Sequence, residues 1–281
     1  MKAYKIASIL LGFSHPDNPL IDDRLVHYET QESPQYEMSV LYHPCITIQE
    51  EVTMTHEQVC TYEDSDKTIT YTYNKSHQLL SKVTIAKDMK RIVIELSEVL
   101  GSKLPMMEYV TTGLYFFEIA LHAGYLPLHA SAIIHESKAV LFSAPSGVGK
   151  STQANLWKTM NPKIEILNDD KPLILCKDEI RVFGTPWCGK TFQNKNTSVP
   201  LKAITFIEQG LENVITPLSN EEKMIHLFKN THRSQISTNL ETTITSMQTL
   251  IEKGNLFFFT CTKTQEAYDT LYQYLYGEVY D

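Results

Sequence analysis

The sequence lacks the marks of several common classes of protein. Its five cysteines are far apart, and no pair of Cys or His residues has the spacing of a zinc site. Its formal net charge of −8 has the wrong sign for a surface that follows a nucleic-acid backbone, and no dense run of Lys or Arg is present. We therefore expect reduced thiols, no bound zinc and no nucleic-acid partner.

Long apolar runs are also missing. The stretch at residues 6–13 is short, and although Lys2 and Lys5 precede it, no small-residue cleavage site follows. Residues 109–134 are more apolar but contain charged and polar side chains, so no uncharged run reaches the roughly 20 residues that a membrane helix needs. We expect a β-strand at residues 6–13, in a soluble, cytoplasmic protein with no membrane partner.

What is present is an apolar content of 42%, enough to build the core of one large or two modest domains from 281 residues. The first hundred residues alternate short β-like runs with turn-forming clusters, which predicts a small, mostly antiparallel, β-rich unit over residues 1–100. Its strands are expected at residues 5–13, 38–44, 68–74, 81–86 and 91–96. The sequence assigns no role to this unit.

A second domain is predicted over residues 101–281. Apolar residues recur at helical spacing from residue 106 to residue 121, and Gly124 should end this bridging helix. From Leu128 the pattern changes to strand, strand, loop, helix and strand, which predicts an α/β fold. Further strands are expected at residues 201–209 and 255–261, and helices at residues 220–230, 241–254 and 264–277.

The segment LFSAPSGVGKS, residues 141–151, has the composition of a phosphate-binding loop. Glycines let consecutive backbone N–H groups turn toward an anion, a lysine reaches the outer phosphates, and a hydroxyl side chain holds Mg²⁺. A short apolar strand precedes the segment and a helix follows it, so the phosphates would lie at a helix N-terminus. The residues expected to hold the phosphates of ATP are Ser146, Gly147, Val148, Gly149, Lys150, Ser151 and Thr152.

We call residues 144–149 the glycine loop. It departs from the usual motif at its first position, where Ala144 stands in place of glycine. Alanine tolerates most backbone conformations with negative φ, so this change is compatible with the motif if Ala144 ends the preceding strand. The alternative is a glycine-containing turn followed by an incidental Lys-Ser pair. The flanking strand and helix favour the phosphate-binding loop over this alternative.

Two adjacent acidic residues follow in the segment KIEILNDDKP. The apolar residues 164–167 predict a strand, which completes a strand–helix–strand unit of the length expected for a parallel crossover. Asp169 and Asp170 would then lie at the carboxyl end of that strand, at the same edge as the phosphates. One could bind Mg²⁺ while the other deprotonates an acceptor hydroxyl, and the sequence leaves open which does which. A solvated turn is the alternative.

Three segments in this order resemble a known family: LHASAIIHESKAVLFSAPSGVGKST, LNDDKP and VFGTPWCGK. They resemble the catalytic domain of HPr kinase/phosphorylase and the bacterial HPr-kinase-like serine kinases, which share a P-loop architecture with phosphoenolpyruvate carboxykinases. The resemblance covers residues 125–218 and implies a P-loop kinase domain with a mixed sheet. It implies that residues 147–151 hold ATP phosphates and Mg²⁺, and that Asp169 and Asp170 are the metal and base carboxylates.

The same resemblance implies that His129, just upstream, faces the active site, although the residue alone would equally suit a core or surface histidine. The sequence departs from true HPr kinases at two places. Thr152 stands where they have an acidic residue, and GTPWCGK, residues 184–190, stands in place of their glycine-rich signature. Phosphorolysis and HPr as the acceptor are therefore left open. The resemblance is closer to the serine-kinase-like group, some of which sit in peptide-modification clusters.

A hairpin that turns at residues 177–179 should return residues 184–190 to the edge that carries the two aspartates. Lys171 and Lys190 could then neutralise charge on the transferring phosphate. Ordinary alternatives are a solvated turn residue for Lys171 and a surface cation for Lys190.

Two further side chains are candidates for the site. Trp187 could line the pocket or be a core aromatic, and Arg233 could clamp the acceptor or be a surface charge. We make no choice between these alternatives from the sequence.

These expectations combine into an ATP- and Mg²⁺-dependent kinase that transfers the γ-phosphoryl group to a hydroxyl, expected on Ser of a small protein or peptide. The other two hypotheses are a carboxykinase-like small-molecule kinase, which would need a basic clamp, and a non-catalytic nucleotide-binding sensor, which would need no base. A homo-oligomer is left open. The candidate catalytic residues are Asp169, Asp170, Lys150, His129, Lys171 and Lys190, and the candidate Mg²⁺ ligands are Ser151, Asp169 and Asp170.

Overall fold

The structure, a computed structural model, describes residues 1–56, 58–234, 236 and 238–277. The chain divides into two compact units, Met1–Ile119 and Ala120–Asp281. The expected boundary after residue 100 falls inside the first unit, because helix α2 (Leu104–His122) begins in the first unit and ends in the second. Each unit is described by itself below.

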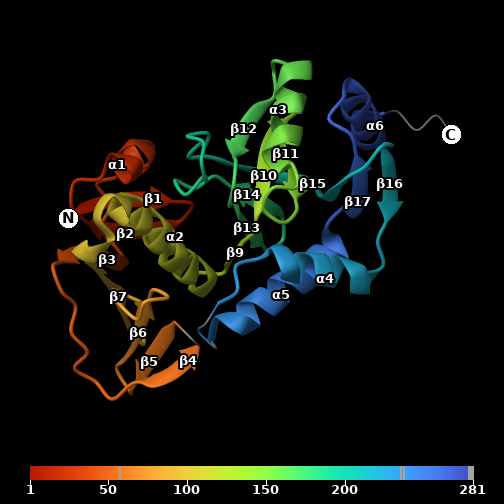
Figure 1. Cartoon of the computed structure of the whole chain (residues 1–281). Coiled ribbons are helices and arrows are strands. Elements are labelled where there is room, and N and C mark those ends of the chain that lie inside the picture. Colours follow the sequence, from red (N-terminus) through yellow and green to blue (C-terminus); the bar gives the residue numbers. More distant parts are fainter. Residues whose placement is uncertain (57, 235, 237, 278–281) are drawn as a thin grey trace. The chain divides into compact units, whose positions relative to one another are not determined.

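The first unit contains an eight-stranded mixed sheet with the strand order β1-β2-β3-β8-β7-β6-β5-β4 (Figure 1). The pairs β2/β3 and β3/β8 are parallel, and the other neighbours are antiparallel. The strands are β1 (Lys2–Ile6), β2 (Ile9–Ser14), β3 (Tyr36–His43), β4 (Thr53–His56), β5 (Val59–Glu63), β6 (Lys67–Tyr73), β7 (Leu79–Ala86) and β8 (Arg91–Ser97). This unit is β-rich and mostly antiparallel, as predicted.

The structure corrects two details of this prediction. Residues 5–13 do not form one strand, because the chain reverses at Ala7, which has a φ of 56°, and makes the hairpin β1/β2. The short helix α1 (Pro19–Leu25) was not expected either. Its start is marked by Asn18, whose side chain accepts from the N–H of Leu20, and by a proline at the first helical position.

The second unit contains a nine-stranded mixed sheet. Its strand order is β12-β10-β11-β15-β14-β13-β9, with β17 beside β15 and β16 beside β17. The strands are β9 (Tyr125–Pro127), β10 (Ala130–His135), β11 (Lys138–Ser143), β12 (Glu165–Asn168), β13 (Leu173–Cys176), β14 (Ile180–Phe183), β15 (Ser198–Gln209), β16 (Val214–Pro217) and β17 (Leu256–Cys261). The helices are α3 (Lys150–Met160), α4 (Asn220–Asn230), α5 (Thr238–Lys253) and α6 (Gln265–Tyr276). The chain is thus a mixed α/β protein.

Helices cover both faces of the second sheet, because its central strands are apolar on both sides. Successive residues of β11 belong to different core clusters, with Val140 packed in one and Leu141 in the other. The cluster of Val140 includes Trp157 of α3 and Leu271 of α6. The cluster of Leu141 includes side chains of α4 and α5. The second unit therefore has a helix layer on each face of the sheet.

Several strand ends meet at one edge of this sheet. Strands β11 and β12 both run antiparallel to β10, so they point in the same direction with β10 between them. Strand β15 is parallel to β11 and also ends at this edge. The predicted strand–helix–strand crossover is confirmed, and it spans one intervening strand. The glycine loop and the aspartate pair therefore follow strands that end at the same edge.

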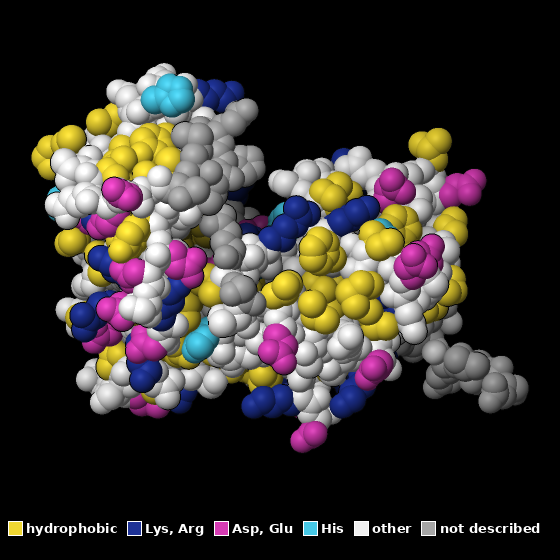
Figure 2. All heavy atoms as spheres, turned by 90° about the horizontal axis from the view of Figure 1, so that it is seen from below, with side chains coloured by type: hydrophobic (Ala, Val, Ile, Leu, Met, Phe, Trp, Pro, Cys, Tyr) yellow, Lys and Arg dark blue, Asp and Glu magenta, His cyan; other side chains and the backbone are white. Residues whose placement is uncertain are grey.

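The outer face of α4 and α5 is partly apolar. Hydrophobic side chains gather over these two helices in the space-filling view, and Ile225, Phe228, Leu240 and Ile244 are exposed there (Figure 2). In the described part of the chain, each helix is too short or too polar to cross a membrane.

Candidate functional site

The glycine loop connects β11 to α3, in the predicted order of strand, loop and helix. Gly147 and Gly149 have φ angles of 86° and 124°, a region of backbone space that favours glycine. A Cβ atom at Gly147 would meet nothing within 4 Å, so the backbone conformation and not a lack of space requires glycine there. Ala144 is buried directly after β11, whereas Ser146 is exposed. The loop is thus open at its tip and buried at its base.

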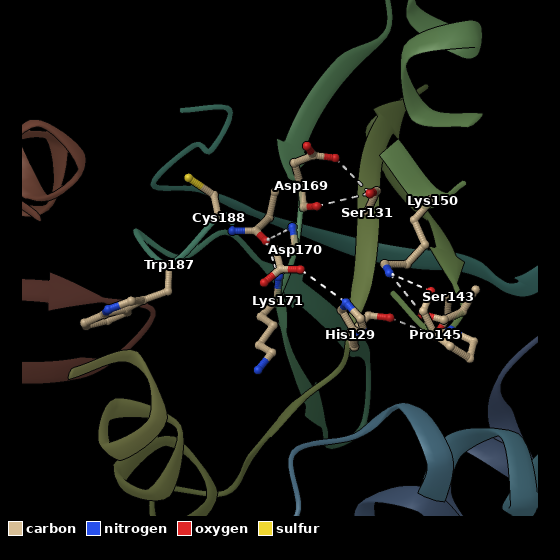
Figure 3. A network of polar contacts seen from close by, with 12 residues as sticks. His129, Ser131, Ser143, Pro145, Lys150, Asp169, Asp170, Lys171, Trp187 and Cys188 are labelled. Carbon is tan, nitrogen blue, oxygen red and sulfur yellow. Dashed lines mark hydrogen bonds and ion pairs between the residues drawn. The ribbon is translucent and has the colours of Figure 1, made fainter. Parts of the chain in front are cut away.

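Lys150 is the first residue of α3 and is only 6% exposed. Its Nζ donates to the carbonyl oxygen of Ala144 at 3.0 Å and to that of Pro145 at 3.4 Å, so the ammonium group lies against the glycine loop (Figure 3). Burial lowers the pKa of Lys150, while the charges of Asp170 and Asp169 raise it. Both predicted aspartates therefore lie close enough to Lys150 to act on its charge.

Asp169 is buried and held by two hydroxyl groups. Its Oδ1 accepts a hydrogen bond from Ser131 Oγ at 2.8 Å, and its Oδ2 accepts one from Thr191 Oγ1 at 3.0 Å. Ser131 lies on β10, whereas Thr191 lies in the segment between β14 and β15. Each carboxylate oxygen is therefore fixed by a donor from a different part of the chain, and the side chain is only slightly accessible to solvent.

Asp170 has a different environment, although it is the next residue. Its Oδ1 lies 3.3 Å from His129 Nε2, and both side chains are partly exposed. The backbone also joins these residues, because the N–H of Ala130 donates to the carbonyl oxygen of Asp170 at 2.9 Å. The two aspartates therefore differ as neighbours at a strand end are expected to differ: one is enclosed and one is accessible.

Asn168 shapes the turn that carries the two aspartates. Its Oδ1 accepts from the backbone N–H of Asp170 at 3.1 Å and of Lys171 at 2.8 Å, while its Nδ2 donates to the carbonyl oxygen of Thr185 at 2.9 Å. This is the turn chemistry expected of an Asn followed by two Asp residues. The same residues therefore form both the turn and the candidate site.

The hairpin β13/β14 returns the chain to this edge, as predicted. Besides the bond from Thr191 to Asp169, Gly189 packs directly on Asp170: a Cβ atom at Gly189 would lie 3.0 Å from the Cβ of Asp170. Gly189 also has a φ of 71°, so both its conformation and its contact favour glycine. We call residues 187–191 the return segment. It contacts both aspartates.

The remaining candidates differ in their exposure and in their neighbours. Lys171 is half-buried, and its charge contributes to lowering the pKa of Lys150, so it belongs to the same electrostatic environment. Lys190 is exposed on the return segment. Trp187 is buried, and its indole ring points away from Lys150 (Figure 3). Arg233 is exposed, with its guanidinium 5.7 Å from the centre of the Phe228 ring.

The oxygen donors at this edge suit a magnesium ion. Asp169 and Asp170 supply carboxylates, and Ser151 supplies a hydroxyl in the first turn of α3. Mg²⁺ commonly binds one or two carboxylates and fills its other positions with water and phosphate oxygens. No cluster of three or more His, Cys, Asp or Glu side chains forms a metal site among the residues that the structure describes. The carboxylates and the hydroxyl fit a Mg²⁺ ion that would take its other oxygens from water and a polyphosphate.

Sequence reasoning missed three polar residues of this centre. Ser131 could have been found, because it follows His129 by two residues in an extended part of the sequence, a spacing that places side chains on the same side of the chain. Asn168 directly precedes the aspartates and has the signature of a turn. Thr191 carries no signal in the sequence, since its partner lies 22 residues away and the contact depends on the path of the chain after β14.

Comparison with known proteins gives a match to a family model. The family model described as SynChlorMet cassette protein ScmC matches residues 92–253, which is more than half of the 281 residues and includes the whole centre from His129 to Thr191. No curated protein matches the chain.

Proposed function

We propose that this chain, which belongs to the SynChlorMet cassette protein ScmC family, is a P-loop kinase that transfers the γ-phosphoryl group of ATP to a hydroxyl, on Ser of a small protein or peptide. The observation that carries the proposal is that Lys150 lies against the glycine loop, while Asp169 and Asp170 follow a strand that ends at the same edge of the sheet. The resemblance of residues 125–218 to HPr-kinase-like serine kinases supports the same reaction.

In the proposed reaction, the acceptor oxygen forms a bond to the γ-phosphorus of ATP while the bond from that phosphorus to the bridging oxygen of ADP breaks. Asp170 takes the proton of the acceptor hydroxyl, which suits a partly exposed carboxylate, and His129 orients that carboxylate. Lys150 and the N–H groups of the glycine loop stabilise the charge on the phosphates.

Asp169 has the complementary role in this proposal. A carboxylate whose two oxygens are both hydrogen-bonded is fixed in orientation, which suits a metal ligand better than a base that must reach a mobile acceptor. Asp169 and Ser151 would hold Mg²⁺, which when bound neutralises negative charge on the phosphate oxygens.

Substitution of the aspartates tests the proposal. We expect Asp170→Asn to lower the rate of phosphoryl transfer at least about 100-fold, the size of a general-base contribution, without loss of nucleotide binding. Asp169→Asn should lower the rate and also weaken Mg²⁺-dependent nucleotide binding. The measurement is transfer of label from γ-labelled ATP in the presence of Mg²⁺ and fractions of a cell lysate, with circular dichroism to check the fold.

Asp178 supplies a matched control, because it is an exposed aspartate in the turn between β13 and β14. Asp178→Asn should leave transfer unchanged. Full activity in both Asp169→Asn and Asp170→Asn would reject the assignment. Label that appears on a metabolite would favour the small-molecule kinase, and nucleotide binding without transfer to any fraction would favour the sensor.

A further inference from the structure

Thr191 connects two parts of the second unit that are distant in sequence. Its Oγ1 lies 3.0 Å from Asp169 Oδ2 and 3.5 Å from the carbonyl oxygen of Cys188. A hydroxyl has one proton to donate, and the shorter distance to a charged acceptor assigns that proton to Asp169. The return segment therefore fixes one oxygen of a carboxylate that β10, through Ser131, fixes at the other oxygen.

The arrangement leaves Asp169 little freedom. The side chain is buried, so water has little access to its oxygens. One donor, Ser131, precedes Asp169 in the sequence, and the other, Thr191, follows it. Hydroxyl donors leave further lone pairs on each carboxylate oxygen for a cation. Partners of this kind, behind a ligating carboxylate, set its orientation, and their loss commonly weakens metal binding.

We propose that Thr191 is a positioning residue, which holds Asp169 in the orientation that binds a magnesium ion together with nucleotide phosphates. This inference rests on the proposed function and adds a residue to it that neither the motifs nor the family resemblance indicate. Its role is exerted through Asp169, and Thr191 itself touches no reacting atom.

A purely structural role for Thr191 makes a different prediction. Its Oγ1 also accepts from the backbone N–H of Gln193 at 3.4 Å, so the hydroxyl could serve only to shape the return segment. Loss of that shape would disturb nucleotide binding with or without metal. Loss of a positioning contact would change only the part of nucleotide binding that depends on Mg²⁺.

The experiment measures the affinity of the purified full-length protein for a fluorescent ADP analogue over a series of Mg²⁺ concentrations. Thr191→Val removes the hydroxyl and keeps the branched shape. We expect it to raise the Mg²⁺ concentration for half-maximal enhancement of binding about 10-fold or more. Binding in the presence of EDTA should stay unchanged. Thr191→Ser, which restores a hydroxyl, should return the Mg²⁺ dependence to within about 3-fold of the original.

Thr270→Val is the matched control, since Thr270 is a half-buried residue of α6 whose hydroxyl donates to the carbonyl oxygen of Glu266 in the same helix. It should behave as the unsubstituted protein. An unchanged Mg²⁺ dependence in Thr191→Val would overturn the inference, and so would an equal loss of binding with and without Mg²⁺. If the unsubstituted protein binds the analogue without any effect of Mg²⁺, the proposed function itself fails, and this inference fails with it.

Discussion

At the scale of single residues, the main finding is that two adjacent aspartates have different surroundings. Asp169 is enclosed by hydroxyl donors, and Asp170 is accessible and contacts a histidine. The sequence predicts that both lie at the end of a strand beside the glycine loop. It does not predict which is buried, because the partners of Asp169 lie 38 and 22 residues away in sequence, and such contacts depend on the completed sheet.

Gly189 gives a prediction at this scale. Gly189→Ala places a Cβ atom 3.0 Å from Asp170 and forces a φ of 71° on alanine. The conformation alone should cost about 1–2 kcal/mol of unfolding free energy. Displacement of Asp170 should lower phosphoryl transfer about 10-fold or more, because small shifts of a catalytic group reduce rates strongly. Denaturant unfolding and steady-state transfer measure the two effects.

Gly124→Ala provides the comparison for this variant. Gly124 has a φ of 88°, and a Cβ atom there would meet nothing within 4 Å. It should therefore show a similar loss of stability with no loss of transfer. Equal transfer rates in the two variants would show that the contact of Gly189 with Asp170 does not affect the reaction.

At the scale of helices and strands, local patterns are reliable where they are long. The helices α3, α4, α5 and α6 and the strands β15 and β17 were predicted from apolar periodicity and from their start and stop signals. The patterns failed for some of the short elements. Strands β4 and β5 and helix α1 have four, five and seven residues, too few to show a period, and the chain reversal at Ala7 lies inside an apolar run.

Helix α2 is fixed within the first unit by a buried carboxylate. Glu108 is fully buried and accepts hydrogen bonds from Asn18 Nδ2 at 2.9 Å and from the hydroxyl of Tyr42 on β3. His15 Nδ1 lies 3.0 Å from the other oxygen, Oε1. A buried carboxylate has no water to hydrogen-bond with, so these partners must stabilise Glu108. We infer that this cluster sets the contact between helix and sheet in the first unit.

Tyr42→Phe tests that inference. It removes one donor and leaves a buried carboxylate oxygen with fewer partners, which should cost about 1–3 kcal/mol of unfolding free energy. Tyr274→Phe, at an exposed position of α6, should cost much less. Urea unfolding followed by far-UV circular dichroism makes the comparison. A loss no larger than that of Tyr274→Phe would mean that Glu108 is stabilised by its other neighbours alone.

At the scale of the whole molecule, the chain is divided into two compact units. Both tryptophans, Trp157 and Trp187, belong to the second unit, so their fluorescence reports on the part that carries the candidate site. Far-UV circular dichroism reports on both units. The two signals should therefore not coincide during unfolding if the units unfold separately.

This difference gives a prediction for ligand binding. ADP with Mg²⁺ at 100 times its dissociation constant should raise the unfolding free energy of the second unit by about 2.7 kcal/mol, since a ligand stabilises only the state that binds it. The tryptophan transition in urea should shift, and the remaining circular dichroism transition should stay in place. A common shift of both signals would instead show that the two units unfold together.

Strand β15 gives the second unit a further property. Its first residues, Ser198–Pro200, pair with β14, and its later residues pair with β11 and β17. Strand β15 is thus hydrogen-bonded near its start to β14, which precedes the return segment. Further along it is hydrogen-bonded to β11, which precedes the glycine loop. The segments that lead into the return segment and into the glycine loop are therefore both paired with the same strand, which fixes their register relative to each other within the second sheet.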